Sequence, residues 1–208
     1  RAKENWDRMQ ALDRFAAENA DWLNDYALFM SLKDENGGVA WENWPYELRM
    51  REENALHSAR ERLYDSMRFY QFVQHLFYQQ WANLRAYANE RGIKIVGDLP
   101  IYVPLDSADV WSAPQEFLLD EQRRPRCVAG VPPDYFSADG QLWGNPIYDW
   151  AYMKQTGYSW WMRRMRSACT LFDCVRIDHF RGLSSYWSVN ADALTARDGE
   201  WVKGPGAH

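Results

Sequence analysis

Two short apolar runs dominate the hydrophobic pattern of the chain, and each ends in an aspartate. The first lies within residues 93–100 and ends at Asp98, with a proline two residues later. The second lies within residues 175–182 and ends at Asp178. Each run has the length and β-branched content of a short buried strand. Because side chains alternate along a strand, Arg176 and Asp178 are expected to project from the same side.

A helical pattern precedes each run. Residues 54–91 carry apolar residues at steps of three and four, and Gly92 follows as a stop signal. Residues 158–172 show a shorter pattern of the same kind. Helices alternating with strands that end in aspartates are typical of parallel (β/α) units, in whose barrels the strand C-termini carry the active site. The first helix has its apolar stripe at Leu63, Met67, Tyr70, Val73, Phe77, Trp81 and Leu84, and the second is expected to turn Arg163, Arg164 and Arg166 away from its stripe.

The fold class that these patterns predict is α/β, an incomplete (β/α)8 (TIM) barrel fragment with helical and long-loop insertions. The chain has 208 residues, whereas a closed barrel takes roughly 250. We therefore expect a piece of a longer polypeptide that lacks the C-terminal part of the barrel. Residues 1–50 are predicted to form a helical insertion region, and residues 51–208 part of the catalytic barrel, including a long loop over 99–157.

Charge and cysteine content restrict the classes of function. The net charge is −5, from 24 basic and 29 acidic residues that are interspersed, which disfavours nucleic acid as a partner. No apolar run approaches membrane-spanning length. Cys127, Cys169 and Cys174 form an odd set without metal-ligand spacing, so we expect buried reduced thiols in a cytoplasmic protein that needs no cofactor or metal.

Aromatic residues suggest a carbohydrate ligand. The chain has 12 Trp and 12 Tyr, and indole rings stack on the C–H faces of sugars. The long loop places Tyr135 and Phe136 behind a double proline, and Trp143 and Asn145 at a turn. We interpret the loop as a stiff aromatic lid over a carboxylate cleft, which restricts water. The alternative is a packed excursion whose aromatic residues are only structural.

The Arg176–Asp178 pair indicates a candidate reaction. A guanidinium beside a carboxylate favours the ionised form, and an ionised, oriented carboxylate at a strand end is what a double-displacement glycosidase uses as its nucleophile. The alternative is an ordinary ion pair that closes a strand.

An ordered set of motifs runs along essentially the whole chain. The motifs are GDLPIYV (97–103), DSADVW (106–111), VAGVPPDYFS (128–137), GQLWGNPIYDW (140–150), VRIDHFRG (175–182) and WVKGPG (201–206). Together they resemble the 4-α-glucanotransferases called amylomaltases or disproportionating enzymes, relatives of the α-amylases that have a (β/α)8 catalytic barrel. The resemblance implies transfer of α-1,4-glucan segments among maltooligosaccharides, amylose or starch-derived glucans, with a sugar 4-hydroxyl as acceptor instead of water.

Matched position by position, the resemblance implies roles for individual residues. Asp178 is the nucleophile that forms the covalent glucosyl-enzyme, and Arg176 holds it ionised and oriented. His179 and Asp98 bind the sugar at the subsite of cleavage. The further substrate-binding residues that the resemblance implies are Tyr135 and Phe136 on the acceptor side, and Trp143 and Asn145 in the cleft.

A retaining mechanism also needs a general acid/base about 5–5.5 Å from the nucleophile. The resemblance places that glutamate, and a further aspartate that stabilises the transition state, on strands after the nucleophile strand. Asp192, Asp198 and Glu200 match no such motif and lie in a stretch that we expect to be strandless. The acid is therefore expected beyond residue 208, and the isolated chain is expected to be inactive.

Two other functions compete with glucan transfer. An amylase-type α-1,4-glucan hydrolase shares the covalent intermediate and differs only in the acceptor. A non-catalytic glucan-binding module uses the aromatic residues alone, although aspartates at two strand ends argue against it. A metal site built from Asp98, Asp178 and His179 is disfavoured because two of these residues are adjacent in sequence instead of at ligand spacing.

Overall fold

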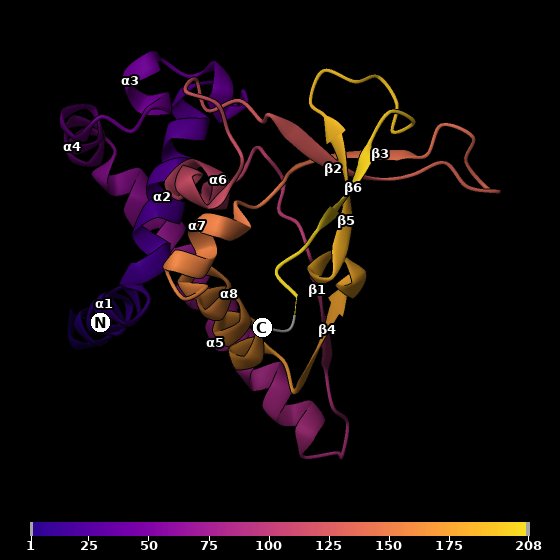
Figure 1. Ribbon diagram of the computed structural model, residues 1–208. Coiled ribbons are helices and arrows are strands. Elements are labelled where there is room, and N and C mark those ends of the chain that lie inside the picture. Colours follow the sequence, from indigo (N-terminus) through magenta and orange to yellow (C-terminus); the bar gives the residue numbers. More distant parts are fainter. Residues whose placement is uncertain (1, 207–208) are drawn as a thin grey trace. The chain divides into compact units, whose positions relative to one another are not determined.

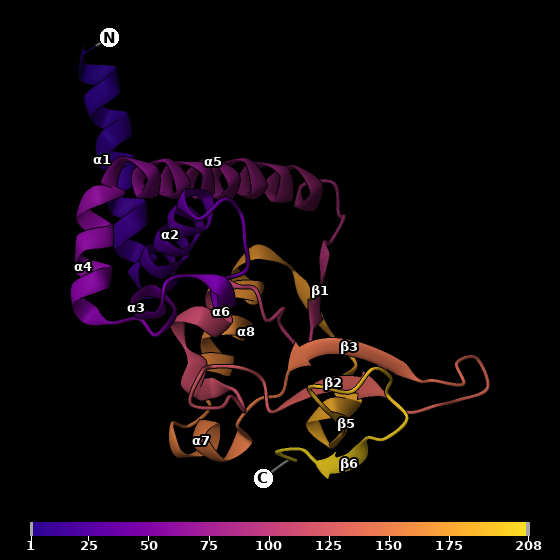
Figure 2. The same cartoon turned by 90° about the horizontal axis from the view of Figure 1, so that it is seen from above.

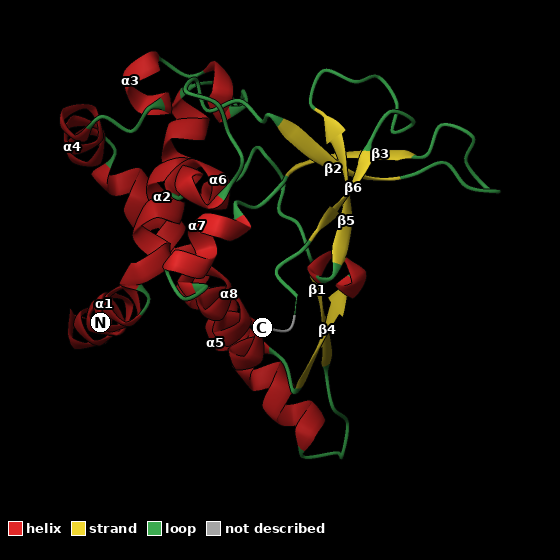
Figure 3. Ribbon diagram, in the orientation of Figure 1, coloured by secondary structure: helices red, strands yellow, loops and turns green. Residues whose placement is uncertain are grey.

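The computed structural model describes residues 2–206, which form two compact units that divide between Ile93 and Lys94. The first unit is helical, and the second combines helices with strands (Figures 1 and 3). The units divide at residue 93, some way after the predicted boundary at residue 50. The assignment of residues 1–50 to a helical insertion of a larger barrel stays a prediction.

The helical unit is built around helix α2, whose Leu23, Ala27, Leu28 and Leu32 are fully buried. Helix α5 packs along α2, and its buried Gln71 donates from Nε2 to Asn24 Oδ1 at 3.2 Å. The elements of this unit are α1 (Ala2–Glu18), α2 (Ala20–Glu35), the 3-10 helix η1 (Trp41–Asn43), α3 (Tyr46–Arg49), α4 (Glu53–Arg62) and α5 (Tyr64–Asn89).

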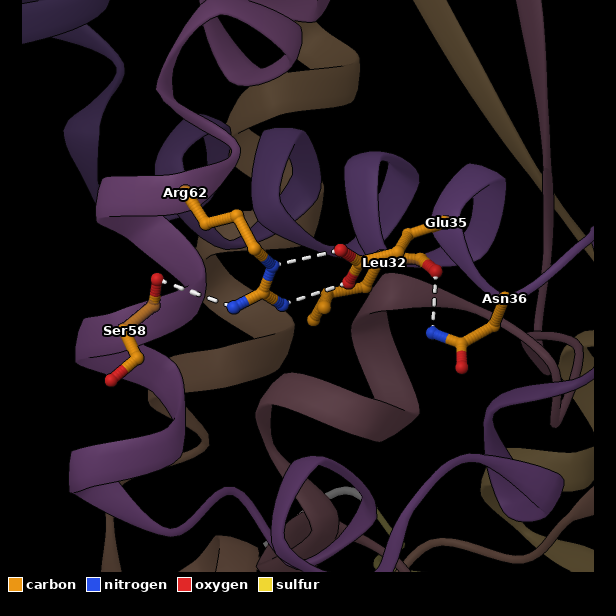
Figure 4. A network of polar contacts seen from close by, with 5 residues as sticks. All are labelled: Leu32, Glu35, Asn36, Ser58 and Arg62. Carbon is orange, nitrogen blue, oxygen red and sulfur yellow. Dashed lines mark hydrogen bonds and ion pairs between the residues drawn. The ribbon is translucent and has the colours of Figure 1, made fainter.

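An arginine ties the end of α4 to the end of α2 (Figure 4). Arg62 donates from Nε to Glu35 Oε1 and from Nη2 to Glu35 Oε2, both at 2.8 Å. This bidentate hydrogen bond holds the pKa of Glu35 below its ordinary value. Arg62 Nη1 also donates to Ser58 O, at 3.4 Å, and Asn36 Nδ2 donates to Leu32 O at the end of α2. The polar residues at these helix ends therefore fix where α4 meets α2.

The helix predicted over residues 54–91 is two helices. Leu63, between α4 and α5, has φ −103° and ψ 17°, which interrupts the helical backbone. The stop at Gly92 is confirmed, since that glycine has a φ of 73°. The predicted apolar stripe is only partly packed, because Phe77 is 45% and Leu84 54% exposed.

The second unit contains two sheets (Figures 1 and 2). Strands β1 (Val96–Pro100) and β4 (Cys174–Asp178) pair in parallel, as the (β/α) pattern predicts. An antiparallel sheet has the order β3-β2-β5-β6. The remaining elements of this unit are α6 (Ala108–Ser112), η2 (Pro114–Glu116), β2 (Cys127–Val131), β3 (Gln141–Pro146), α7 (Trp150–Gln155), α8 (Ser159–Leu171), η3 (Phe180–Leu183), β5 (Ser185–Asn190) and β6 (Glu200–Lys203).

The antiparallel sheet corrects two predictions. The long loop expected over 99–157 contains strands β2 and β3 and the helices α6, η2 and α7. The stretch that holds Asp192, Asp198 and Glu200, predicted to be strandless, lies between β5 and β6, and Glu200 opens β6. Strand β5 joins the two regions because it pairs with β2 on one side and β6 on the other.

Burial also departs from the prediction at the parallel pair. Strands β1 and β4 were expected to be buried, yet Val96 is 62% exposed and β4 exposes alternate residues. The α/β class is confirmed, whereas no sheet closes among residues 2–206. The three cysteines are free thiols, but Cys169 and Cys174 are exposed instead of buried.

Candidate active site

Two carboxylates and one guanidinium meet on the parallel pair, with Asp98 and Arg176 in the middle of β1 and β4 and Asp178 at the C-terminal end of β4. The parallel register sets Asp98 opposite Arg176 and Pro100 opposite Asp178. Arg176 binds Asp98 with two hydrogen bonds, Nε to Oδ1 at 2.9 Å and Nη2 to Oδ2 at 2.5 Å. The same Nη2 lies 3.5 Å from Asp178 Oδ1. The predicted Arg176–Asp178 ion pair is present, whereas the two hydrogen bonds from Arg176 to Asp98 were not predicted from the sequence.

This arrangement gives the two carboxylates different interactions with Arg176. The Arg176 hydrogen bonds lower the pKa of Asp98, and Asp98 in turn raises the pKa of the guanidinium. Both oxygens of Asp98 accept hydrogen bonds from Arg176, whereas Asp178, among residues 2–206, makes the longer ion pair with the same guanidinium. The Asp178 side chain is 58% exposed, so its carboxylate is open to a ligand.

His179 follows Asp178 in a turn that points its ring at Trp143. Its backbone is left-handed, with a φ of 51° and a ψ of 41°, which ends β4 and begins η3. The ring of His179 meets the ring of Trp143 edge-on, with 4.9 Å between centroids. Partial burial lowers the pKa of His179, although the Asp178 charge opposes the shift. The imidazole is therefore neutral at neutral pH.

Tyr102 lies against the predicted residue Trp143, although sequence reasoning did not single it out. It lies in the motif that follows Asp98, is buried, and meets Trp143 edge-on with centroids 6.3 Å apart. Burial raises its pKa well above the ordinary range. A Cβ on Gly182 would lie 2.6 Å from Ile101 Cδ1 and 3.6 Å from the Tyr102 hydroxyl, so the turn after His179 approaches the exit of β1 closely. The only signal was the aromatic residue inside an apolar motif.

Arg164 was predicted to face away from the packed side of its helix, and this prediction is wrong. Its Nη2 donates to Pro100 O at 2.6 Å, and its Nη1 donates to Ile101 O at 3.0 Å and to the Tyr148 hydroxyl at 3.3 Å. Tyr148, fully buried, donates to the same Ile101 carbonyl at 2.7 Å. Helix α8 therefore fixes the chain where it leaves β1, directly after Asp98.

Strand β3 contributes two of the predicted residues. Trp143 lies against His179 and donates from Nε1 to Gln141 Oε1 at 3.0 Å. Asn145 donates from Nδ2 to Val103 O at 2.9 Å, which ties β3 to the segment after β1. Trp143 is 37% exposed, so part of the indole is open to a ligand beside His179.

Tyr135 and Phe136 lie at the tip of the segment between β2 and β3, residues 132–140, which we call the aromatic loop. The loop projects from the antiparallel sheet (Figures 1 and 2). The rings of Tyr135 and Phe136 meet edge-on and are 97% and 93% exposed. Within residues 2–206, no hydrogen bond or ring contact joins them to Asp98, Asp178 or Trp143. The structure thus groups the other predicted residues and leaves this pair apart.

The described part of the chain offers neither a metal site nor a membrane-spanning helix. No group of three or more His, Cys, Asp or Glu side chains there is arranged to hold a metal ion. No helix there is both long and apolar enough to cross a membrane.

Comparisons with known proteins agree on one family. The family described as 4-alpha-glucanotransferase matches residues 1–208. A 4-alpha-glucanotransferase of Thermus thermophilus is 50% identical over 204 residues, which are 98% of this chain and 41% of that protein. A chloroplastic/amyloplastic 4-alpha-glucanotransferase of Solanum tuberosum is 44% identical over 187 residues, which are 90% of this chain and 32% of that protein.

A solved structure extends the likeness to three dimensions. The amylomaltase from Streptococcus agalactiae in complex with acarbose superimposes with a TM-score of 0.92 at 44% identity, covering 95% of this chain and 40% of that chain. The amylomaltase from Corynebacterium glutamicum shares the fold at 19% identity, with a TM-score of 0.73. The chain spans about two fifths of the length of the bacterial relatives that it matches, as the 41% coverage of the Thermus protein shows.

Proposed function

This chain belongs to the 4-alpha-glucanotransferase family, and we propose that the protein containing it transfers α-1,4-glucan segments between maltodextrins. The reaction is a double displacement that retains the anomeric configuration, with Asp178 as nucleophile. The (β/α)8 barrel supplies the framework, of which β1 and β4 are two parallel strands.

The observation that carries the proposal is that the carboxylates of Asp98 and Asp178 interact differently with Arg176. Asp98 is held by two hydrogen bonds from Arg176. Asp178 is exposed, and its distance from the same guanidinium is longer, at 3.5 Å. A nucleophilic carboxylate must be ionised, oriented and unhindered. The weak approach of Arg176 helps to orient Asp178 without occupying the oxygen that attacks.

The first displacement forms a bond between an Asp178 carboxylate oxygen and the anomeric carbon C1 of the donor sugar. The bond from C1 to the glycosidic oxygen breaks, and that oxygen takes a proton from a general acid. We place this acid on a later strand, since Asp192, Asp198 and Glu200 match no family motif. In the second displacement, the 4-hydroxyl oxygen of an acceptor glucan attacks C1, and the bond from C1 to Asp178 breaks. The hydroxyl proton goes to the general acid, which became a carboxylate in the first displacement.

The neighbouring side chains bind the donor sugar. Asp98, fixed by Arg176, accepts hydrogen bonds from sugar hydroxyls, and neutral His179 offers both a donor and an acceptor nitrogen. The exposed part of Trp143 gives an apolar surface for a sugar face beside His179. Asn145 acts indirectly, because its side-chain amide holds the segment after β1.

The aromatic loop covers the acceptor side of the cleft in this proposal. Two almost fully exposed rings on a projecting loop have no packing role within the described residues. A bound glucan gives them a partner, and their apolar surface keeps water from the covalent intermediate. This arrangement favours transfer over hydrolysis, which is the property that separates the proposed enzyme from an amylase.

Incubation with maltotriose tests the function in a protein of the relatives' full length that carries these residues. Transfer produces glucose and maltopentaose in equal amounts, whereas hydrolysis produces glucose and maltose. Glucose with maltose and no longer product would favour the hydrolase. Binding of maltodextrins without any product would favour the non-catalytic module and would refute the proposal.

A further inference from the structure

The aromatic loop is internally rigid. We call residues 138–139, where it returns to β3, its base. Asp134 Oδ1 accepts hydrogen bonds from the backbone N–H groups of Phe136 and Ser137, both at 2.8 Å. The Ser137 hydroxyl donates to Gly140 O at 2.6 Å. These bonds fix the shape of the tip, while its two rings are almost wholly in solvent. The direction in which the rings point therefore depends on how the base of the loop is held.

A segment distant in sequence holds that base. Arg197 forms an ion pair with Asp139, with its Nε 2.7 Å from Oδ1, and the same Nε lies 3.1 Å from Ala138 O. The backbone N–H of Ala196 donates to Asp139 O at 3.0 Å. Three polar contacts thus join residues 196–197 to residues 138–139, where the aromatic loop returns to β3.

The holding segment is itself fixed to the sheet. Ala196 is fully buried in a cluster with Val128 of β2 and Val189 of β5. Trp187 of β5 donates from Nε1 to Ala196 O at 2.8 Å. A Cβ on Gly140 would come within 3.0 Å of Ala196 Cβ, so the loop base and the segment are in close contact. Residues 196–197 are therefore held by the sheet and can in turn hold the base of the loop.

We propose that Arg197 is a positioning residue that orients the aromatic loop and thereby sets the preference for a sugar over water as acceptor. This inference rests on the proposed function, because it assigns a consequence to a loop that the proposal places over the acceptor side. In the proposed mechanism Arg197 contacts neither the reacting atoms nor the glucan. It acts through the loop backbone, since loss of its contacts leaves residues 138–139 held by the Ala196 N–H, and the loop ends held by the pairing of β2 with β3.

The side chain offers a graded set of variants. Arg197→Met keeps much of the aliphatic stem and removes both polar contacts. Arg197→Lys keeps a charge for Asp139 but loses the planar Nε–H that reaches Ala138 O. Asp139→Asn keeps an acceptor oxygen and removes the charge. Arg124→Met, at an exposed arginine in another turn of the same unit, is the control.

The test measures loop order and acceptor choice in a protein of the relatives' full length. Arg197→Met should speed amide hydrogen exchange at Ala196 and in residues 136–140. It should also raise the ratio of hydrolysis to transfer on maltotriose by roughly two- to fivefold, the scale of an exposed ion pair. Arg197→Lys should fall between Arg197→Met and the unchanged protein, and Arg124→Met should match the unchanged protein.

The outcomes separate this inference from the proposed function. Unchanged exchange in Arg197→Met would show that the arginine does not hold the loop. Faster exchange with an unchanged product ratio would show that loop order does not set the acceptor, and either result overturns the inference. Absence of transfer in the unchanged protein would refute the proposed function instead. Thermal melting of each variant confirms folding, and Arg197→Lys serves where Arg197→Met does not fold.

Discussion

Arg176 lies opposite Asp98 in the parallel pair and binds it through two hydrogen bonds, at 2.5 and 2.9 Å. Its distance to Asp178, two residues along its own strand, is 3.5 Å. The cross-strand neighbour therefore takes the bidentate geometry that guanidinium and carboxylate groups prefer. The carboxylate on the same strand is left available for chemistry.

Replacing Arg176 should change the ionisation of Asp98. The lowered pKa of Asp98 comes chiefly from the Arg176 hydrogen bonds, so Arg176→Met should return it toward its ordinary value of 3.8. A lowered carboxyl pKa contributes stability above the unfolded value, and this contribution is lost as pH falls through the folded value. Arg176→Met should remove that contribution.

Carbon-detected titration of the Asp98 carboxyl checks this prediction. Both side chains are exposed, so added salt should narrow the difference between Arg176→Met and the unchanged protein. Arg124→Met is the control. An Asp98 titration that is the same with and without Arg176 would contradict the prediction.

Asp178→Asn should abolish transfer. The amide cannot form the covalent intermediate, so less than about one part in a hundred of the activity on maltotriose should remain. Binding of long maltodextrins should stay nearly intact, because Asp98, His179 and Trp143 are unchanged. Asp192→Asn is a matched control in the same unit. Substantial residual transfer in Asp178→Asn would remove Asp178 from the role of nucleophile.

The fold could be predicted from the sequence where local periodicity carried it. The helix over 158–172 and the two strands that carry Asp98 and Asp178 were found because apolar spacing is a local signal, although β1 continues past Asp98 to Pro100. Strand β3 was missed because Gln141–Pro146 contains Gly, Asn and Pro, which are depleted in strands. Its sheet depends on β5, about forty residues later, and such long-range pairing leaves no local period.

The sequence predicted that Asp98, Arg176 and Asp178 come together, but it did not predict how they pair or that Tyr135 and Phe136 lie apart from them. Alternation along one strand shows that Arg176 and Asp178 share a side, but it cannot show which residue of another strand lies opposite. The parallel register, which sets Asp98 against Arg176, appears only in the fold. The contacts of Arg164 were missed for a similar reason. A basic residue beside an apolar stripe is usually solvated, and nothing in the local sequence indicates that two backbone carbonyl groups of another segment lie within its reach.

His179 should make stability depend on pH in a defined window. Burial lowers its pKa below the ordinary value of 6.5, so the unfolded chain binds a proton more readily than the folded one. The resulting contribution to stability is present above pH 6.5 and is lost as pH falls through the lowered folded pKa. His179→Gln should therefore show a smaller loss of stability on acidification than the unchanged protein.

Denaturant unfolding of the two proteins between pH 7.5 and 5 measures the difference. His57→Gln, which replaces an exposed histidine of the helical unit, is the matched control variant. Equal slopes for the unchanged protein and His179→Gln would show that His179 does not carry this dependence.

Arg164→Met should destabilise the second unit. The change removes hydrogen bonds to the carbonyl groups of Pro100 and Ile101, and it leaves the Tyr148 hydroxyl with one partner fewer. Hydrogen bonds from charged groups are worth about 1.5–3 kcal/mol each, so we expect a loss of about 2–3 kcal/mol. Urea unfolding measures it. Arg166→Met, at an exposed arginine on the same helix, should stay within about 0.5 kcal/mol of the unchanged protein, and equal effects of the two changes would contradict the assignment.

Removing both rings of the aromatic loop should shift the products from transfer toward hydrolysis. Tyr135 and Phe136 are almost wholly exposed, so their replacement by alanine should cost little folding stability. In the proposed function the rings contact the acceptor glucan, and their loss admits water to the covalent intermediate. An aromatic contact is worth roughly 1 kcal/mol, which corresponds to about a fivefold rise in the ratio of hydrolysis to transfer.

The measurement compares free reducing ends with redistributed chain lengths in maltotriose digests. Leu194→Ala replaces a 95% exposed apolar side chain of the same unit and is the control for general surface changes. The cleavage rate itself should change less than the product ratio, because Asp178 and the donor-side residues are untouched. An unchanged ratio in Tyr135→Ala/Phe136→Ala would return the loop to a structural role and would leave the choice of acceptor to residues elsewhere in the protein.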